Sequence, residues 1–314
     1  MKKIWAWCKK IGQTRFVKCV KSYFGWDDGI ALGIATIGFM YYCKNGLIPY
    51  HPGWYQFYGN IHSELIGIGL TVLILGNADQ YIRTKLEKKK LILQMGSTDN
   101  GFALEAVRQL EARGWLYDGT LRKSKLYEAN LTNAHLDKAN LKGSNLMRAD
   151  LRSSTLWLAE LSDCCMDMAH LEGARLRGAN MDRARFNQSH LKDAEMSEVK
   201  AYGASMWRAD MRNAHLDSAK LECASLSNAN LEGAYMYHAY LVNADLRNSN
   251  LRGAKLSGAC LHKATLTGAD LRDVVFDETT IWAEAKYDSG ADGTKWPDGF
   301  DPEDAGVVLV EDTS

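Results

Sequence analysis

Large apolar residues occupy every fifth position of the chain between residues 121 and 281. The series begins with Leu121, Leu126 and Leu131 and ends with Phe276 and Ile281. A small residue, most often Ala or Ser, stands two positions before nearly every one of them, and Asn, Asp and Gly recur in between. A repeat sustained over this length constrains the fold more than any local propensity does.

A period of five excludes an amphipathic helix, because five helical residues carry a side chain roughly 140° beyond a full turn. In an extended segment, residues i and i−2 point the same way, so each large residue and the small residue before it can both face inward. The remaining residues must then turn a corner, which Gly, Asn and Asp tolerate. Repeated corners predict coils that stack through strand hydrogen bonds about 4.7–4.9 Å apart.

Segments such as Ala129-Asn130-Leu131 resemble the pentapeptide-repeat family, whose pattern is Ala-(Asp/Asn)-Leu-x-x. The resemblance implies that four pentapeptides form one square coil and that the coils stack into a right-handed quadrilateral β-helix. We therefore predict a mainly β solenoid over residues 119–282. Ala201 at a large position and Val199 at a small one depart from the pattern, and we expect them to exchange volume so that packing density is kept.

Two apolar runs precede the repeat, at residues 29–43 and 65–78. We interpret them as spans of about 27–45 and 57–78, a transmembrane hairpin within residues 27–80, although each run is short against the ~20 residues that cross a bilayer. Two buried helices of a soluble domain are the alternative. Small residues allow helices in lipid to approach closely or to oligomerise. The glycines predicted to pack in this way are Gly29, Gly33, Gly69 and Gly76.

Basic residues are concentrated in residues 1–26 and 83–90, whereas the loop between the apolar runs carries only Lys44. The positive-inside rule therefore predicts the inner membrane with both termini in the cytoplasm. Residues 1–26 also contain several aromatic side chains. We predict a basic amphipathic helix that lies at the lipid surface, with an ordinary solvated helix as the alternative.

Residues 81–118 are predicted to form a cytoplasmic helix and an N-terminal cap for the solenoid, whose first coil would otherwise expose apolar side chains and strand edges. Ser97-Thr98-Asp99-Asn100 supplies a helix start and Gly114 a stop. The stretch from Leu65 through the segment 99–106 to Gly114-Trp115-Leu116 resembles the linker of bacterial membrane-tethered pentapeptide proteins. The residues predicted to share the covering face of the helix are Phe102, Ala106, Val107 and Leu110.

Residues 283–314 are predicted to form a C-terminal cap or tail. Their segment Asp292-Gly293-Thr294-Lys295-Trp296-Pro297 resembles the tail of many such repeat proteins, and we expect it to fold over the last coil. Residues 307–310 are expected to add a short strand or an interface.

Composition adds little chemistry to this picture. The formal net charge is zero, and the seven cysteines show no paired metal-ligand spacing, which fits reduced thiols in the cytoplasm. We find no nucleophile, phosphate-loop or metal-cluster motif. We therefore predict a chain without enzymatic activity that has no catalytic residues, no cofactor, no metal site and no small-molecule substrate.

Two columns of polar residues emerge when twenty residues are counted to a coil. His170 and His190 would stack in adjacent coils, with Asp150 and Asp210 beyond them. A metal or proton site is one interpretation, but this position favours Asn or Asp, so we interpret the column as a solvated polar ladder. A second column has partly alternating charge and predicts ion pairs between coils: Arg152, Glu172, Lys192, Arg212, Glu232, Arg252 and Arg272.

Outward-facing aromatic residues are the predicted protein-binding site, because aromatic side chains often anchor interfaces. Counting by twenty gathers the tyrosines near one edge, although scattered surface aromatics are also normal. The predicted partner-binding residues are Trp157, Tyr202, Trp207, Tyr235, Tyr237 and Tyr240.

We predict a membrane-anchored scaffold that presents a cytoplasmic rod to a protein partner or to a second copy of itself. A membrane effector or channel subunit is an alternative. The resemblance suggests a further one, since some pentapeptide proteins mimic DNA and regulate a topoisomerase. That mode relies on a strongly acidic rod, whereas residues 121–281 hold about as many basic as acidic side chains. No nucleic-acid partner is expected.

Overall fold

A computed structural model describes residues 76–289 and 293–310 of the chain. The predicted surface helix (residues 1–26) and nearly all of the predicted hairpin, with Gly29, Gly33 and Gly69, lie outside the described residues. The chain divides into two units, Met1–Leu86 and Glu87–Ser314. Within the described ranges, the helices are too short or too polar to span a bilayer.

A helix covers residues 76–95. Its first turns are exposed and carry an ion pair between Arg83 and Asp79 at 2.7 Å, four residues apart. Gly76 is the first described residue of this helix, and a Cβ added there would meet no atom within 4 Å. Its predicted role in membrane packing stays a prediction.

Helix α5 (Asn100–Ala112) begins and ends where the sequence indicates. The Asp99 side chain caps it by accepting a 3.0 Å hydrogen bond from the Phe102 amide. At its other end Gly114 adopts a positive φ of 70°, and the Trp115 amide donates to the Leu110 carbonyl. Glycine at this position relieves the steric penalty of the left-handed conformation, which ends the helix.

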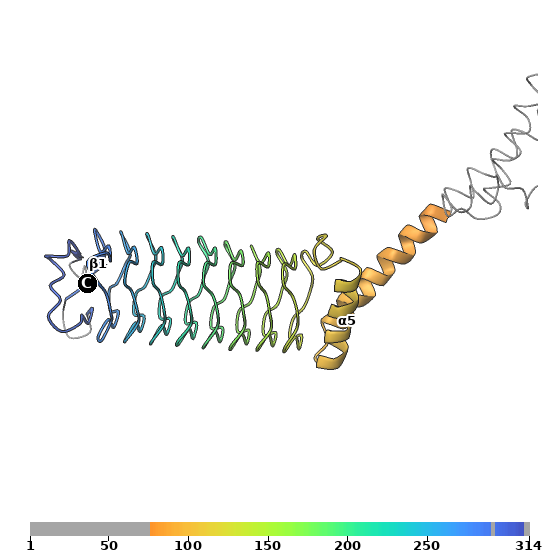
Figure 1. Cartoon of the computed structure of the whole chain (residues 1–314), viewed down its shortest axis with the longest axis horizontal. Coiled ribbons are helices and arrows are strands. Elements are labelled where there is room, and N and C mark those ends of the chain that lie inside the picture. The colour runs from red at the N-terminus through yellow and green to blue at the C-terminus, as the bar shows by residue number, and fades with distance from the viewer. Residues whose placement is uncertain (1–75, 290–292, 311–314) are drawn as a thin grey trace, which may run out of the picture. The chain divides into compact units, whose positions relative to one another are not determined.

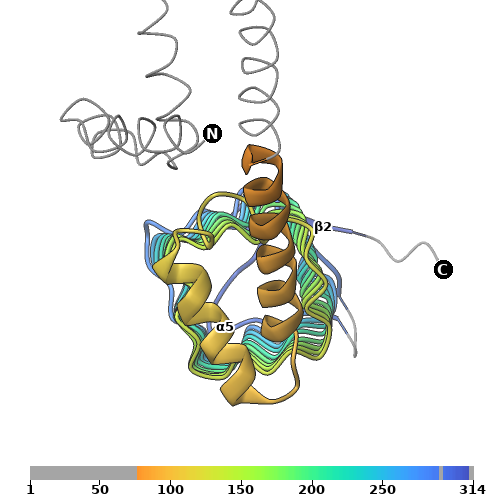
Figure 2. The same cartoon turned by 90° about the vertical axis from the view of Figure 1, so that its right-hand side faces the viewer.

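The buried face of α5 differs from the predicted face at one residue. Phe102 is 62% exposed, so its predicted inward position is wrong, and Ala103 is buried in its place. Ala103 shares a stripe with Ala106, Val107 and Leu110, because these residues lie three, four and seven positions apart. Figure 2 shows α5 lying across the first coil, where its buried face belongs to the core of the rod.

Residues 121–275 form the stacked coils seen in Figure 1. Parallel bridges join each residue of the ladder to the residue twenty positions later, from Lys125–Asn145 to Lys255–Val275. The large and small positions of the repeat are buried, including both Val199 and Ala201. The predicted β-helix solenoid is therefore confirmed for these residues.

Each repeat contains a tight turn with the same backbone geometry. The amide of the fourth turn residue donates to the carbonyl of the first, as Ala129 does to Leu126 at 3.2 Å. Every fifth residue from Lys123 to Asp273 has a positive φ. A positive φ at the third position is the mark of type II turns. Gly and Asn suit it, whereas a residue such as Leu158 (φ 54°) adopts it at an energetic cost.

The register changes after Val275. Ile281 pairs with Cys260, a separation of 21 residues instead of twenty. The predicted inward positions of Phe276 and Ile281 are wrong, since these side chains are 36% and 48% exposed, whereas Trp282 is buried. The extra residue lies between Phe276 and Ile281, so it moves Ile281 out of the inward position and brings Trp282 into it. Phe276 comes before the extra residue, and Val275 beside it has no bridge to a later coil among the described residues.

Aromatic side chains cover the C-terminal end of the coils. Strand β1 (Lys286–Tyr287) pairs in parallel with β2 (Val308–Leu309). Lys295 bridges to Asp270, which places this part of the tail beside the last coil. The packed rings, with centroid separations from 4.8 to 5.9 Å, are Phe276, Trp282, Tyr287, Trp296 and Phe300.

Candidate functional site

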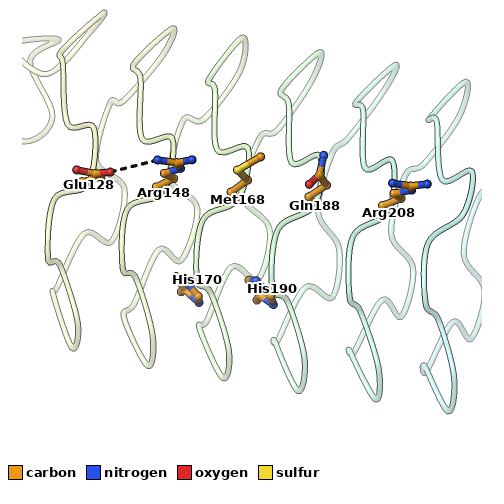
Figure 3. Close-up of a pocket in the computed structure, with 7 residues that line it drawn as sticks. All are labelled: Glu128, Arg148, Met168, His170, Gln188, His190 and Arg208. Carbon is orange, nitrogen blue, oxygen red and sulfur yellow. Dashed lines mark ion pairs between the residues drawn. The ribbon is translucent and has the colours of Figure 1, made fainter.

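Two histidines stack face to face on the outside of the rod. The ring centroids of His170 and His190 are 4.7 Å apart and their planes differ by 4°. The ladder sets this spacing, because the two residues are bridge partners in adjacent coils. Their predicted stacking is therefore confirmed, and Figure 3 shows both side chains on one side of a shallow groove.

Glu172 completes a cluster with the two histidines. Its Oε1 lies 3.4 Å from Nδ1 of His170. Its Oε2 is buried and has no hydrogen-bond partner among the described residues. One nitrogen from each histidine and one Glu172 oxygen all lie within 4.8 Å of one another. Two imidazoles and a carboxylate form a donor set that divalent transition metals accept.

The carboxylates above and below the histidines are already paired. Arg152 donates to Asp150 through Nε at 2.9 Å, and Arg212 donates to Asp210 at 2.8 Å. These hydrogen bonds hold the pKa of Asp150 and the pKa of Asp210 below the usual range. Glu172 is consequently the carboxylate of this region that remains available to a ligand.

The ion pairs predicted along the column of Arg152 do not form. Arg152, Arg212 and Arg272 each pair with the aspartate two residues earlier on their own coil. This geometry lets a planar guanidinium meet both carboxylate oxygens at once. Among the described residues, only Arg252 of this column forms an ion pair with the next coil, where it meets Asp273 at 2.8 Å.

A groove of about 670 Å³ lies beside the histidines. Figure 3 shows its opposite wall as a row of side chains that contributes one residue from each coil. Within that row Arg148 lies 3.5 Å from Glu128. The groove is lined by Glu128, Arg148, Met168, His170, Gln188, His190 and Arg208.

The structure brings part of the predicted aromatic site together. The rings of Tyr235 and Tyr237 are 6.5 Å apart, and Tyr235 stacks on His215 at 4.5 Å. Tyr240 is exposed in the same coil. We call Tyr235, Tyr237 and Tyr240 the tyrosine cluster.

The other predicted aromatic residues lie elsewhere on the rod. Trp157 shares a column with Tyr237 but is 80 residues, or four coils, away, which is about 19 Å at the strand spacing. Trp207 lies half a coil around from that column, next to Arg208 at 4.5 Å. Tyr202 is exposed in the turn that follows the column of Tyr240, two coils earlier than Tyr240.

Sequence reasoning missed Glu172 as a neighbour of the histidines. The available signal was a His-x-Glu segment with a second histidine one coil later. The backbone turns after His170, and the second residue of that turn brings Glu172 back toward the imidazole. Cys164 gives no further reactive site, since burial raises the pKa of its thiol to about 12 and keeps the thiolate out of reach.

The match to a protein family lies within the coils. The family described as "Pentapeptide repeats (8 copies)" matches residues 120–157, 158–193, 194–233 and 234–273. Three solved structures are similar to this chain. HetL from the cyanobacterium Nostoc, a pentapeptide repeat protein involved in heterocyst differentiation regulation, is 28% identical. The match covers 52% of this chain and 82% of HetL, with a TM-score of 0.31.

QnrB1, a plasmid-mediated fluoroquinolone resistance protein, is 18% identical, with 60% of this chain and 89% of QnrB1 covered and a TM-score of 0.35. A pentapeptide repeat protein from the Arabidopsis thaliana thylakoid lumen is 30% identical. The match covers 34% of this chain and 68% of the Arabidopsis protein, with a TM-score of 0.19. No curated protein sequence matches the chain. The family match includes neither α5 nor the aromatic C-terminal end.

Proposed function

Because its coils place this chain in the pentapeptide-repeat family, whose members are generally structural or interaction proteins, we propose that it is a membrane-anchored scaffold without enzymatic activity. The rod binds a protein partner, or a second copy of the chain, through the tyrosine cluster. The observation that carries this proposal is the exposure of these side chains on one coil of a continuous hydrogen-bonded ladder.

The ladder makes the rod a rigid platform. Amides of each coil donate to carbonyls of the coils beside it, as Tyr235 does to Ala214 and Leu216 does to Tyr235. The outer side chains are thus fixed at the strand spacing before any partner arrives. A surface that is already ordered loses less conformational entropy on binding, which raises affinity.

The tyrosine cluster has the chemistry of a binding anchor. Tyrosine offers a large apolar ring and a hydroxyl while it restricts only two side-chain torsions on binding. Tyr235 is further held by its stacking on His215. Aromatic anchors of this kind dominate many protein interfaces.

Crosslinking in native membranes tests the partner-binding proposal. When the full chain carries Tyr235→Ser and Tyr237→Ser, the yield of crosslinked complex is expected to be at least tenfold lower than with the unaltered chain. Tyr127→Ser is the matched control, because Tyr127 has the same place in its turn as Tyr237 but lies half a coil around the rod. Equal loss in both variants, or recovery of the unaltered chain only as a monomer, would refute the proposal.

The proposed anchor rests on the sequence of residues 27–80, with its two apolar runs and the basic residues on either side. The full chain is expected to stay in the membrane pellet after extraction with alkaline carbonate. The exposed Cys223 is expected to react with an impermeant maleimide only after the cells are opened, with Cys223→Ser as the control. Recovery of the chain in the soluble fraction would contradict membrane anchoring.

A further inference from the structure

We propose that His170, Glu172 and His190 form a binding site for one divalent transition-metal ion, with Zn²⁺ as the reference ion. The site goes beyond the scaffold function and replaces the sequence-based interpretation of this column as a solvated ladder. Three observations carry it: the stacked imidazoles, the nearby carboxylate and the buried carboxylate oxygen that lacks a hydrogen-bond partner.

The donor types and distances suit such an ion. Zinc binds imidazole nitrogen and carboxylate oxygen at about 2.0–2.2 Å, so two ligands of a tetrahedral ion lie about 3.3 Å apart. The donor atoms of the cluster already lie within 4.8 Å of one another. The imidazole planes are parallel, so the rings must rotate about their side-chain torsions for both nitrogens to face one ion.

The site would hold the ion with three protein ligands and leave a coordination position open. Open three-ligand sets of this type bind water or a ligand from another molecule at the remaining position. The side-chain surfaces of His170 and Glu172 are 45% and 36% exposed, so an ion reaches them directly from solvent. Nickel and copper ions also accept imidazole, so selectivity would depend on the geometry of the site.

The surrounding charges leave Glu172 as the anionic ligand. Asp150 and Asp210 are neutralised by Arg152 and Arg212. Glu172 makes no ion pair with an Arg or Lys among the described residues; the Lys192 nitrogen in its column lies 4.0 Å from Asp193. A divalent ion would therefore meet one carboxylate without a basic partner beside two imidazole side chains.

The rod carries an incomplete copy of the same arrangement. His215 is followed two residues later by Asp217, whose Oδ2 lies 4.0 Å from the His215 Nδ1 and whose Oδ1 is buried without a hydrogen-bond partner. One coil later the stacking residue is Tyr235 instead of a second histidine. This copy offers only one imidazole, so it serves as an internal control.

Titration of the full chain with Zn²⁺, followed by calorimetry, tests the site. The chain is purified without a polyhistidine tag. His170→Gln and His190→Gln are each expected to weaken binding at this site at least tenfold, and the double variant to bind one equivalent fewer than the unaltered chain. His215→Gln is the matched control and is expected to keep the full stoichiometry. Circular dichroism of the metal-free variants verifies that the coils remain folded.

Tyr235→His provides a test in which the expected result is a gain of metal binding, which unfolding of the variant cannot produce. It places a second imidazole above His215 and Asp217, so the variant is expected to bind one equivalent of Zn²⁺ more than the unaltered chain. The proposal is overturned if the His170 and His190 double variant binds as the unaltered chain does. A Tyr235→His chain with no added equivalent would also overturn it.

Discussion

The middle of the rod and its C-terminal end bury apolar side chains by different means. In the middle, the inward residue of each repeat is covered by the repeats twenty residues before and after it, and Leu151 or Phe186 is fully buried. At the end no further coil follows, the bridge separation rises to 21 residues, and a group of aromatic rings provides the cover. An inward position is therefore defined by the neighbouring coil and not by the sequence count alone.

Truncation of a phenylalanine in each region tests this difference most strongly. Phe186 is fully buried in the middle, so Phe186→Ala is expected to lower the free energy of unfolding by about 3–5 kcal/mol through lost burial and a cavity. Phe276 is 36% exposed at the end, and Phe276→Ala is expected to lower it by about 1 kcal/mol, since less apolar area returns to water.

Urea unfolding of the two variants measures both values. An equal loss in the two variants would show that the end is packed as tightly as the middle, and the comparison would fail. A larger loss for Phe276→Ala would mean that its T-shaped contacts with Trp282 and Phe300, at 5.9 and 5.2 Å, dominate the stability of the rod.

The difference between the middle of the rod and its C-terminal end also determines how much of the structure the sequence predicts. Counting by five identified the buried positions of the coils, and counting by twenty identified the His170–His190 stack. Counting failed at Ile281 because the turn before it contains an extra residue, and at Phe276 because the described residues include no bridge from Val275 to a later coil. The helical pattern misplaced Phe102 because the buried stripe of α5 follows Ala103, Ala106, Val107 and Leu110, and Phe102 lies beside that stripe.

The candidate site was predicted less completely than the fold. A column count gives the coil and the side of the rod but not the direction of neighbouring side chains. Arg152 therefore turns to Asp150 on its own coil instead of to the next coil, and Glu172 meets His170. Charge alternation along a column carries no information about these contacts within one coil.

Val199 and Ala201 depart from the repeat, and they test whether the buried positions in the middle of the rod need a fixed residue size or only a fixed total volume. Both are fully buried, and restoring the repeat with Val199→Ala and Ala201→Leu together is expected to change the free energy of unfolding by less than about 1.5 kcal/mol. Ala201→Leu alone is expected to cost about 1–3 kcal/mol, since Val199 occupies the space that the larger side chain needs. Independent, additive effects in a double-mutant cycle would show that the two residues do not exchange volume.

Acid is expected to weaken the middle through its paired aspartates. Hydrogen bonds from Arg212 and Arg247 hold the pKa of Asp210 and the pKa of Asp245 below the unfolded value. A lowered folded pKa means that this stabilisation is present above the unfolded pKa, about 3.9, and is lost as pH falls through the folded pKa. Thermal unfolding between pH 6 and pH 2 should show a falling midpoint below about pH 4.

Asp245→Asn and Arg247→Gln together provide the control for this acid dependence. The double variant is expected to have a shallower loss of its unfolding midpoint between pH 4 and pH 2, because one of the paired carboxylates is gone. High salt is also expected to flatten the curve, since these pairs are partly exposed. A curve that keeps its slope in both experiments would assign the acid sensitivity to other groups.

The smallest change in the free energy of unfolding is expected from substitution of two leucines with similar exposure, Leu158 in the middle (46%) and Leu309 in β2 (44%). Leu158 has a φ of 54°, which Asn tolerates better than Leu, so Leu158→Asn is expected to stabilise the rod by about 0.5–1 kcal/mol. Leu309 is outside the positive-φ residues, and Leu309→Asn is expected to destabilise slightly because Asn is disfavoured in strands. Thermal unfolding of both variants decides the sign. A loss for Leu158→Asn would mean that packing of its side chain, whose Cδ2 lies where a Cβ of Gly178 would stand, outweighs the backbone strain of the turn.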